Sequence, residues 1–187
     1  EKTVLTRNVA ANPFLPTGPD KAERFEELLT IAALGLKKRL SHVRAGCAVI
    51  GLSGGLDSTL AILTTARAFD LLGWDRKKIV AITMPCFGTT RRTRSNAELL
   101  AEELGADLQV VDISAAVRQH FADIGQSMED HSVTFENGQA RERTQVLMDI
   151  ANMRNGLVIG TGDLSEMALG WCTYNGDHMS MYSVNSS

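Results

Sequence analysis

Cysteine is scarce in this sequence of 187 residues, and its placement excludes two common ways of stabilising a small domain. The three cysteines are Cys47, Cys86 and Cys172, and no two of them form a CxxC pair. An odd number without such a pair argues against a disulfide scaffold and against a structural zinc site. The pattern is typical of proteins kept in a reducing cytosol, so we expect a cytoplasmic location.

Long hydrophobic runs and a strong net charge are also absent. No apolar run approaches the roughly 18 residues that a membrane helix requires, so the chain is not expected to span a bilayer. The net charge of −3 argues against a broad nucleic-acid-binding surface. The hydrophobic fraction of 44% and the charged fraction of 22% are those of an ordinary globular domain.

Residues 1–19 contain three of the four prolines and are expected to form an extended linker. Residues 20–187 then form one domain. The chain begins at Glu1 rather than at methionine, and residues 184–187 show no pattern of a closing helix or strand. We therefore expect a piece of a longer protein, with the domain incomplete at its C-terminus.

Short apolar segments alternate with segments of helical periodicity along this domain. Such alternation predicts an α/β fold, a doubly wound parallel sheet with helices on both faces. In sheets of this kind ligands bind beyond the carboxyl ends of the strands, where the winding direction changes. The loops after Leu52, Met84 and Gly160 are therefore the candidate ligand loops. Strands are predicted at residues 47–52, 79–84, 108–112 and 157–160, helices at 20–40, 58–72, 95–104, 113–124, 140–153 and 163–169, and capping boxes at Asp20–Glu23 and Ser95–Glu98.

The loop after the first strand, residues 51–59 (GLSGGLDST), has the features of a phosphate site. Its glycines allow a sharp turn with exposed N–H groups, and the helix beginning near Ser58 directs its positive end at the same place. The loop is neither a Walker A motif nor GxGxxG. Asp57 sits where a lysine would be expected, and a carboxylate beside phosphates requires a cation between them, most simply Mg²⁺. Alternatively, Asp57 only caps the helix.

Residues 160–171 (GTGDLSEMALGW) follow the fourth strand and can face the first loop across the crevice. Asp163 could cap the short helix, and Glu166 could point to a metal shared with Asp57. Two carboxylates with phosphates between them make a hard-oxygen Mg²⁺ site. The alternative for Glu166 is a glutamate that only favours the helix dipole.

Two further segments carry side chains suited to ligand binding. Trp171 and Tyr174 could form a stacking platform for a flat ring, or could pack into the core. In the ENGQAR segment, Asn137 could be a plain N-cap, and Arg141 either a solvated charge or a phosphate partner.

These stretches resemble three motifs that occur in this order in NAD synthetases: SGGLDS (residues 53–58), ENGQAR (136–141) and GTGDLSEMALGWCTY (160–174). The family is part of the ATP pyrophosphatase, or PP-loop, superfamily, whose fold is adenine nucleotide alpha hydrolase-like. The resemblance covers roughly residues 47–187. Residues 12–14 (NPF) are similar to the segment that follows the glutaminase domain of the glutamine-dependent subgroup. Leu56, where ammonia-dependent members often carry glutamine, favours the same subgroup.

The resemblance implies a carbon–nitrogen ligase that amidates deamido-NAD to NAD through an acyl-adenylate, releasing AMP and pyrophosphate. It implies ATP as a substrate, Mg²⁺ as cofactor, ammonia delivered by a glutaminase domain, and a homo-oligomer. Two alternatives remain: another adenylating ligase of the GMP synthetase kind, and a nucleotide-binding module without turnover.

The resemblance also implies a set of site residues. Asp57 and Glu166 are the expected catalytic and metal-binding residues. The expected ATP-binding residues are Gly51, Leu52, Ser53, Gly54, Gly55, Leu56, Asp57, Ser58, Met84 and Thr161. The expected deamido-NAD-binding residues are Asn137, Arg141, Glu166, Trp171, Cys172, Thr173 and Tyr174.

Overall fold

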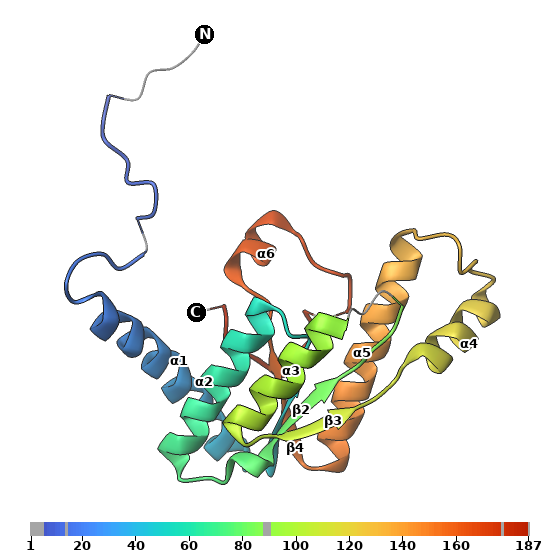
Figure 1. Ribbon diagram of the computed structural model, residues 1–187, viewed down its shortest axis with the longest axis horizontal. Coiled ribbons are helices and arrows are strands. Elements are labelled where there is room, and N and C mark those ends of the chain that lie inside the picture. The colour runs from blue at the N-terminus through green and yellow to red at the C-terminus, as the bar shows by residue number, and fades with distance from the viewer. Residues whose placement is uncertain (1–5, 14, 88–90, 177, 187) are drawn as a thin grey trace.

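A sheet of five parallel strands, in the order β3-β2-β1-β4-β5, forms the centre of the protein (Figure 1). The computed structural model describes residues 6–13, 15–87, 91–176 and 178–186, without the side chains of residues 91–95. The chain winds from β1 outward to β2 and β3, then returns past β1 to β4, so the predicted doubly wound sheet is confirmed. The strands are β1 (Cys47–Gly51), β2 (Ile79–Thr83), β3 (Asp107–Val110), β4 (Gly156–Gly160) and β5 (Tyr182–Ser183).

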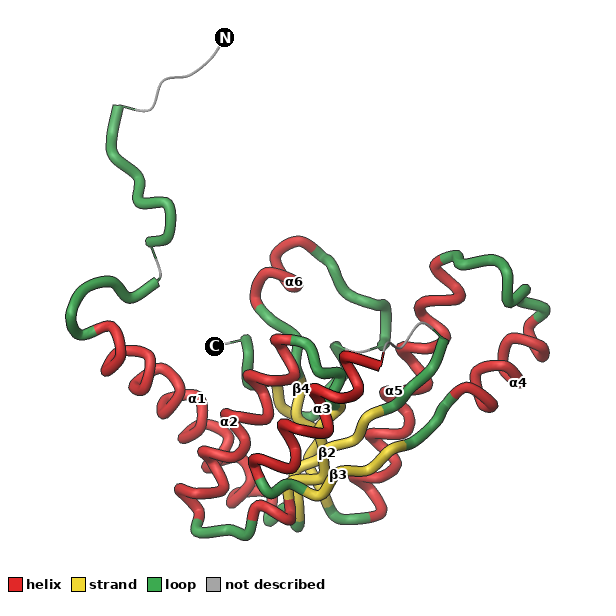
Figure 2. Tube along the Cα trace, in the orientation of Figure 1, coloured by secondary structure: helices red, strands yellow, loops and turns green. Residues whose placement is uncertain are grey.

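Helices cover both faces of the sheet (Figure 2). Ala48 and Ile50 of β1 pack in the cluster beneath α1 (Lys21–Val43), α2 (Leu56–Leu72) and α3 (Arg91–Leu104). Cys47 and Val49, which point to the opposite face, pack in the cluster with α4 (Ser114–Ile124) and α5 (Val133–Met153). Because both faces are covered, β1 and β2 are near-continuous apolar runs, which is why the sequence revealed them.

Helix α5 begins at Val133, seven residues before the predicted start at residue 140. Residues 125–137 resembled a loop because Asn137 and Gly138 are poor helix formers. Tertiary packing overrides this propensity: the rings of Phe135 and Phe121 lie 5.5 Å apart, and a Cβ at Gly138 would lie 2.4 Å from Cε1 of Phe121. The proposed N-cap role of Asn137 is therefore wrong, since this residue lies inside the helix.

The two predicted capping boxes are also wrong. Asp20 is the N-cap residue of α1, but its carboxylate pairs with Nε of Arg24 at 2.5 Å and accepts no capping hydrogen bond. Helix α3 begins at Arg91 rather than at Ser95, so the Ser95–Glu98 pair lies within the helix.

The C-terminal residues contain a strand that the sequence did not predict. Strand β5 pairs with β4 in parallel, with Tyr182 opposite Ile159. Two residues are too few for a hydrophobic period to be recognised. At the other end, residues 6–13 and 15–19 form neither helix nor strand, and the segment extends away from the sheet (Figure 1). Phe14 of the NPF motif lies outside the described residues.

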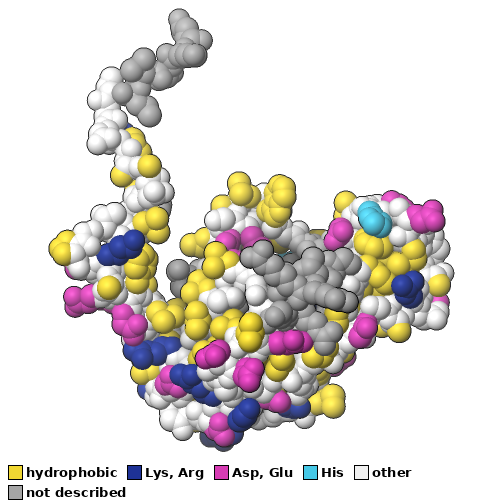
Figure 3. All heavy atoms as spheres, in the orientation of Figure 1, with side chains coloured by type: hydrophobic (Ala, Val, Ile, Leu, Met, Phe, Trp, Pro, Cys, Tyr) yellow, Lys and Arg dark blue, Asp and Glu magenta, His cyan; other side chains and the backbone are white. Residues whose placement is uncertain are grey.

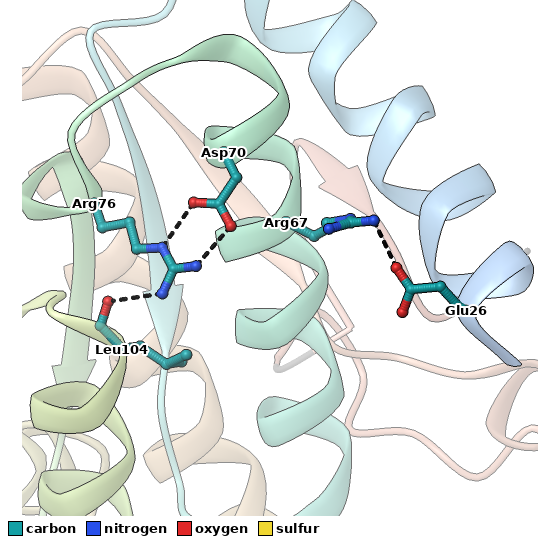
Figure 4. Close-up of polar contacts among 5 residues, drawn as sticks. All are labelled: Glu26, Arg67, Asp70, Arg76 and Leu104. Atoms are coloured by element: carbon teal, nitrogen blue, oxygen red, sulfur yellow. Dashed lines mark hydrogen bonds and ion pairs between the residues drawn. The ribbon is translucent and has the colours of Figure 1, made fainter. Parts of the chain in front are cut away.

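Two ion pairs on the α2 side of the sheet join α2 to neighbouring segments, one to the segment just before β2 and the other to α1 (Figure 4). Arg76 donates to both carboxylate oxygens of Asp70, at 2.9 and 2.6 Å, and reaches the carbonyl oxygen of Leu104 at 3.4 Å. Arg67 pairs with Glu26 of α1 at 2.5 Å. The hydrogen bonds from Arg76 lower the pKa of the Asp70 carboxyl below its usual value.

We expect Asp70→Asn to lower the free energy of unfolding by about 0.5–1 kcal/mol at neutral pH, since the pair is partly exposed. A carboxyl whose pKa is lowered by folding stabilises the protein above its unfolded-state pKa. This stabilisation is lost as the pH falls through the folded-state pKa, so the difference between wild type and variant should begin to shrink at about pH 4 and disappear only below the lowered pKa of Asp70. Urea denaturation between neutral and acidic pH measures the difference, with Glu27→Gln as an exposed control. A difference that persists in acid would contradict the assignment.

Candidate functional site

A cavity of about 490 Å³ opens at the carboxyl ends of β1, β2 and β4. The sheet changes its winding direction between β1 and β4, so the cavity lies at the switch point that the sequence predicted. Its walls come from the loop after β1, the end of β2, one face of α5 and the loop after β4.

The loop after β1 turns directly into helix α2. Gly54 adopts φ +80°, which a residue with a side chain rarely does, and Gly55 is the N-cap. Helix α2 begins at Leu56, so Asp57 lies in the first helical turn. The alternative that Asp57 is only the N-cap is therefore wrong.

The first N–H groups of α2 are available to a ligand. The first hydrogen bond of the helix runs from Thr59 N to the carbonyl oxygen of Gly55 at 3.1 Å, and the N-cap residue Gly55 has no side chain that could cap this terminus. The N–H groups of Leu56, Asp57 and Ser58 therefore have no intrahelical partner. Together with the positive end of the helix dipole they favour an anion such as phosphate.

Hydroxyl groups of the loop hold it in shape. Gly55 N donates to Oγ of Ser53 at 3.2 Å, and the hydroxyls of Ser53 and Ser58 lie 3.1 Å apart. Ser58 and Thr59 both donate to the carbonyl oxygen of Gly55, at 3.1 and 2.8 Å. The loop is thus fixed by its own side chains, and of its N–H groups that of Gly55 is used within the loop.

The loop after β4 leads into α6 (Leu164–Leu169), which Asp163 caps as predicted. Glu166 N donates to Oδ1 of Asp163 at 2.8 Å, and Asp163 N donates to Oε2 of Glu166 at 3.0 Å, which completes a capping box. Glu166 therefore has a structural role, and it also lines the cavity together with Asp57.

The donor set of the cavity fits Mg²⁺. No group of three His, Cys, Asp or Glu side chains suited to a metal occurs in the described part of the chain. Magnesium is usually held by one or two carboxylates together with phosphates and water. Asp57 and Glu166, on walls formed by two loops, could supply the carboxylates.

Most of the expected ATP-binding residues share this cavity. Met84 is buried at the end of β2, and Thr161 follows β4. Leu56 is 83% exposed, and it and Gly54 belong to the loop but not to the cavity wall. The expected residues on the wall are Gly51, Leu52, Ser53, Gly55, Asp57, Ser58, Met84 and Thr161.

The expected deamido-NAD residues, apart from Glu166, lie outside the cavity wall. Trp171 and Tyr174 are 79% and 71% exposed, so the alternative that they pack into the core is wrong. Arg141 Nε donates to the carbonyl oxygen of Tyr174 at 3.2 Å, which joins α5 to this segment. Cys172 is exposed, and Asn137 and Thr173 are half-buried.

The sequence reasoning missed the α5 side of the cavity. Ala140, Arg143, Thr144 and Leu147 lie on one helical face and line the wall, as does Met179 from the C-terminal segment. Among the described wall residues, Arg143 carries the only basic side chain. The helical spacing from Ala140 to Leu147 was visible in the sequence, but it does not show which face of the helix looks toward the sheet.

Fold and cavity together define an α/β domain with a glycine-rich loop at the switch point of its parallel sheet. Comparison with known proteins narrows this class, because the family model described as NAD synthase matches residues 28–183. The chain belongs to the NAD synthase family, which confirms the predicted resemblance. None of its described helices is both long and apolar enough to cross a membrane.

Individual relatives agree with this assignment. The glutamine-dependent NAD(+) synthetase of Mycobacterium tuberculosis strain H37Rv is 43% identical over 97% of this chain, which spans 28% of that protein. The structure of a glutamine-dependent NAD⁺ synthetase from Acinetobacter baumannii, bound to ADP, has a TM-score of 0.80 and 26% identity, covering 92% of this chain and 32% of its own. An NH3-dependent NAD synthetase from Campylobacter jejuni, in complex with nitrate, has a TM-score of 0.75 and 26% identity, covering 87% and 67%.

Proposed function

We propose that this cavity is the site at which ATP and deamido-NAD react on the way to NAD. The observation that carries the proposal is the convergence of two loops at the switch point of the sheet, which places Asp57 and Glu166 on the walls of one cavity. Relatives named as NAD synthetases match nearly the whole chain, and one solved relative holds ADP.

The proposed reaction has two steps. An oxygen of the nicotinate carboxylate attacks the α-phosphorus of ATP, the bond to the bridging oxygen breaks, and pyrophosphate leaves with the electron pair. The nitrogen of ammonia then attacks the acyl carbon, the bond to AMP breaks, and loss of a proton gives the amide. A free carboxylate does not react in this way, because oxide is a poor leaving group. No protein nucleophile is needed.

The work of the protein is positioning and electrostatics. The N–H groups at the start of α2 bind the phosphates, and the loop hydroxyls keep those groups in place. Asp57 and Glu166 would hold Mg²⁺, which when bound supplies positive charge toward the phosphates. Arg143, on the α5 wall, would bind phosphate oxygens with its guanidinium group. The main chain at Met84 would lie near the adenine.

The segment from Trp171 to Tyr174 would bind deamido-NAD. Its two rings are exposed, so a flat nicotinate or adenine ring can stack on them. Asn137 and Arg141 of α5 would join it, since Arg141 already contacts the carbonyl oxygen of Tyr174.

We propose that a glutaminase domain supplies ammonia and that residues 1–19 link it to the synthetase domain, because the 43%-identical relative is a glutamine-dependent enzyme. A homo-oligomer is supported by the hydrophobic side chains gathered over α6 (Figure 3). Leu164, Met167 and Leu169 there are 55%, 64% and 76% exposed. The cytoplasmic location stays a prediction from the cysteine pattern.

Pyrophosphate release by the full-length protein tests the proposed function. With ATP, Mg²⁺ and ammonium, we expect release to require deamido-NAD and to yield NAD and AMP in equal amounts, while xanthylate gives no product. Amidation of xanthylate would instead indicate a GMP synthetase-like ligase. Binding of ATP without release in the presence of either acid would indicate a nucleotide-binding module.

A further inference from the structure

The side chain of Asn185 joins the first turn of α2, which carries Asp57, to the loop that leads from β4 into α6, the helix that carries Glu166. Its Nδ2 donates to the carbonyl oxygen of Asp57 and to the carbonyl oxygen of Thr161, both at 2.9 Å. Carbonyl oxygens only accept hydrogen bonds, so the amide must direct its NH₂ group at these two atoms. One amide group therefore spans from the first turn of α2 to the loop after β4.

The other atom of this amide has an unusual environment. Oδ1 of Asn185 is buried and accepts no hydrogen bond from the described residues. A buried acceptor without a partner lowers stability, because it has lost its hydrogen bonds to water, and it calls for an explanation. The amide keeps this orientation because its NH₂ group makes both hydrogen bonds to the loops, and a flipped amide would lose them.

The segment around Asn185 is fixed against the β4 loop. Gly160 pairs with Ser183 in β5, and the hydroxyls of Ser183 and Ser186 donate to the carbonyl oxygen of Gly162 at 3.2 and 3.0 Å. The two hydroxyls also lie 2.9 Å from each other, and among the described residues neither contacts α2. Asn185 adds the contact across the crevice to α2, between residues 128 positions apart in the chain.

Asn185 is linked to both carboxylate residues, directly to Asp57 and through the β4 loop to Glu166. On one side it holds the main chain of Asp57 itself. On the other it holds Thr161, two residues before Asp163, and the capping box fixes Glu166 to Asp163. A change at Asn185 would therefore alter the separation of the two carboxylates without removing either of them.

We propose that Asn185 is a positioning residue that fixes the phosphate loop relative to the β4 loop, so that Asp57 and Glu166 act on one metal–nucleotide complex. This inference rests on the proposed function, in which those carboxylates hold Mg²⁺ beside ATP. Asn185 itself does not line the cavity and is assigned no contact with substrate.

The test is calorimetric titration of ATP into the full-length protein with and without Mg²⁺. The readout is the factor by which Mg²⁺ strengthens ATP binding, that is, the ratio of the ATP affinity with Mg²⁺ to the ATP affinity without it. A general loosening of the fold would weaken ATP binding under both conditions and leave this factor unchanged. Asn185→Ala should reduce this factor by about 10–100-fold, the usual effect of changing a residue that orients metal ligands, while ATP binding without Mg²⁺ stays nearly unchanged. Asn185→Asp, which keeps the size but removes the donor group, should act in the same way.

Ser186→Ala is the matched control, because its hydroxyl contacts the β4 loop but not α2. It should keep the wild-type factor. The proposal is overturned if both Asn185 variants keep the wild-type factor, or if Ser186→Ala loses as much as they do. Absence of any Mg²⁺ effect in the wild type would overturn it together with the metal role of Asp57 and Glu166. Binding of ATP without deamido-NAD is measured, so the identity of the acid substrate does not affect the outcome.

Discussion

Asp57→Asn should lower the rate of pyrophosphate release by about 10³-fold while leaving the fold intact. The amide has the size of the carboxylate but lacks the charge that would hold a cation beside the phosphates. Asp57 is exposed, and its carboxylate makes no hydrogen bond with the described residues, so the substitution breaks no structural contact. Losing a carboxylate from a first helical turn costs only about 0.3–1 kcal/mol of stability, far less than the expected loss of catalysis.

The measurement is pyrophosphate release over a range of Mg²⁺ concentrations, with circular dichroism as a check on the fold. Glu23→Gln offers a matched control, because Glu23 is also a carboxylate in a first helical turn but lies in α1, away from the cavity wall. Its activity should stay within about twofold of wild type, as is usual for an exposed surface substitution. Wild-type turnover in the Asp57 variant would remove Asp57 from the metal site.

Those parts of the site that are local in sequence could be predicted from the sequence. The phosphate loop is nine consecutive residues, 51–59, placed between a buried strand and a helix, so its glycines and hydroxyls act on one another directly. That Asp57 and Glu166 line one cavity also followed, although they are far apart in the chain, because parallel strands bring their carboxyl ends to one edge of the sheet.

The parts that depend on distant contacts could not be predicted. Residues 133–139 are helical because Phe135 and Gly138 pack on Phe121 of another helix, against their local preference. The orientation of α5, and with it the position of Arg143, depends on the same packing. No local sequence pattern indicates the role of Asn185. Its two contacts, to Asp57 and Thr161, exist only because β5 places it between two segments that are far apart in the chain.

Arg143→Ala should lower kcat/KM for ATP by about 10²–10³-fold. The cavity wall contains the carboxylates of Asp57 and Glu166, and the bound triphosphate adds further negative charge. Arg143 has the only basic side chain among the described wall residues, and its guanidinium group has no ion-pair or hydrogen-bond partner among the described residues. A planar group with several N–H donors matches phosphate oxygens in pairs, so we expect it to bind the phosphates rather than the adenine.

Titration with inorganic pyrophosphate and with adenosine separates this role from a structural one. Arg143→Ala should weaken pyrophosphate binding and leave adenosine binding unchanged, because only the phosphates meet the guanidinium group. Arg143→Lys keeps the charge but loses the paired donors, so its kcat/KM should fall between those of wild type and the alanine variant. Arg39→Ala, at an exposed position of α1, controls for the loss of one positive charge from the protein. Equal weakening of pyrophosphate and adenosine binding would show that Arg143 only shapes the α5 wall. Selective weakening of pyrophosphate binding would show that its guanidinium group contacts pyrophosphate, which is the leaving group of the first step.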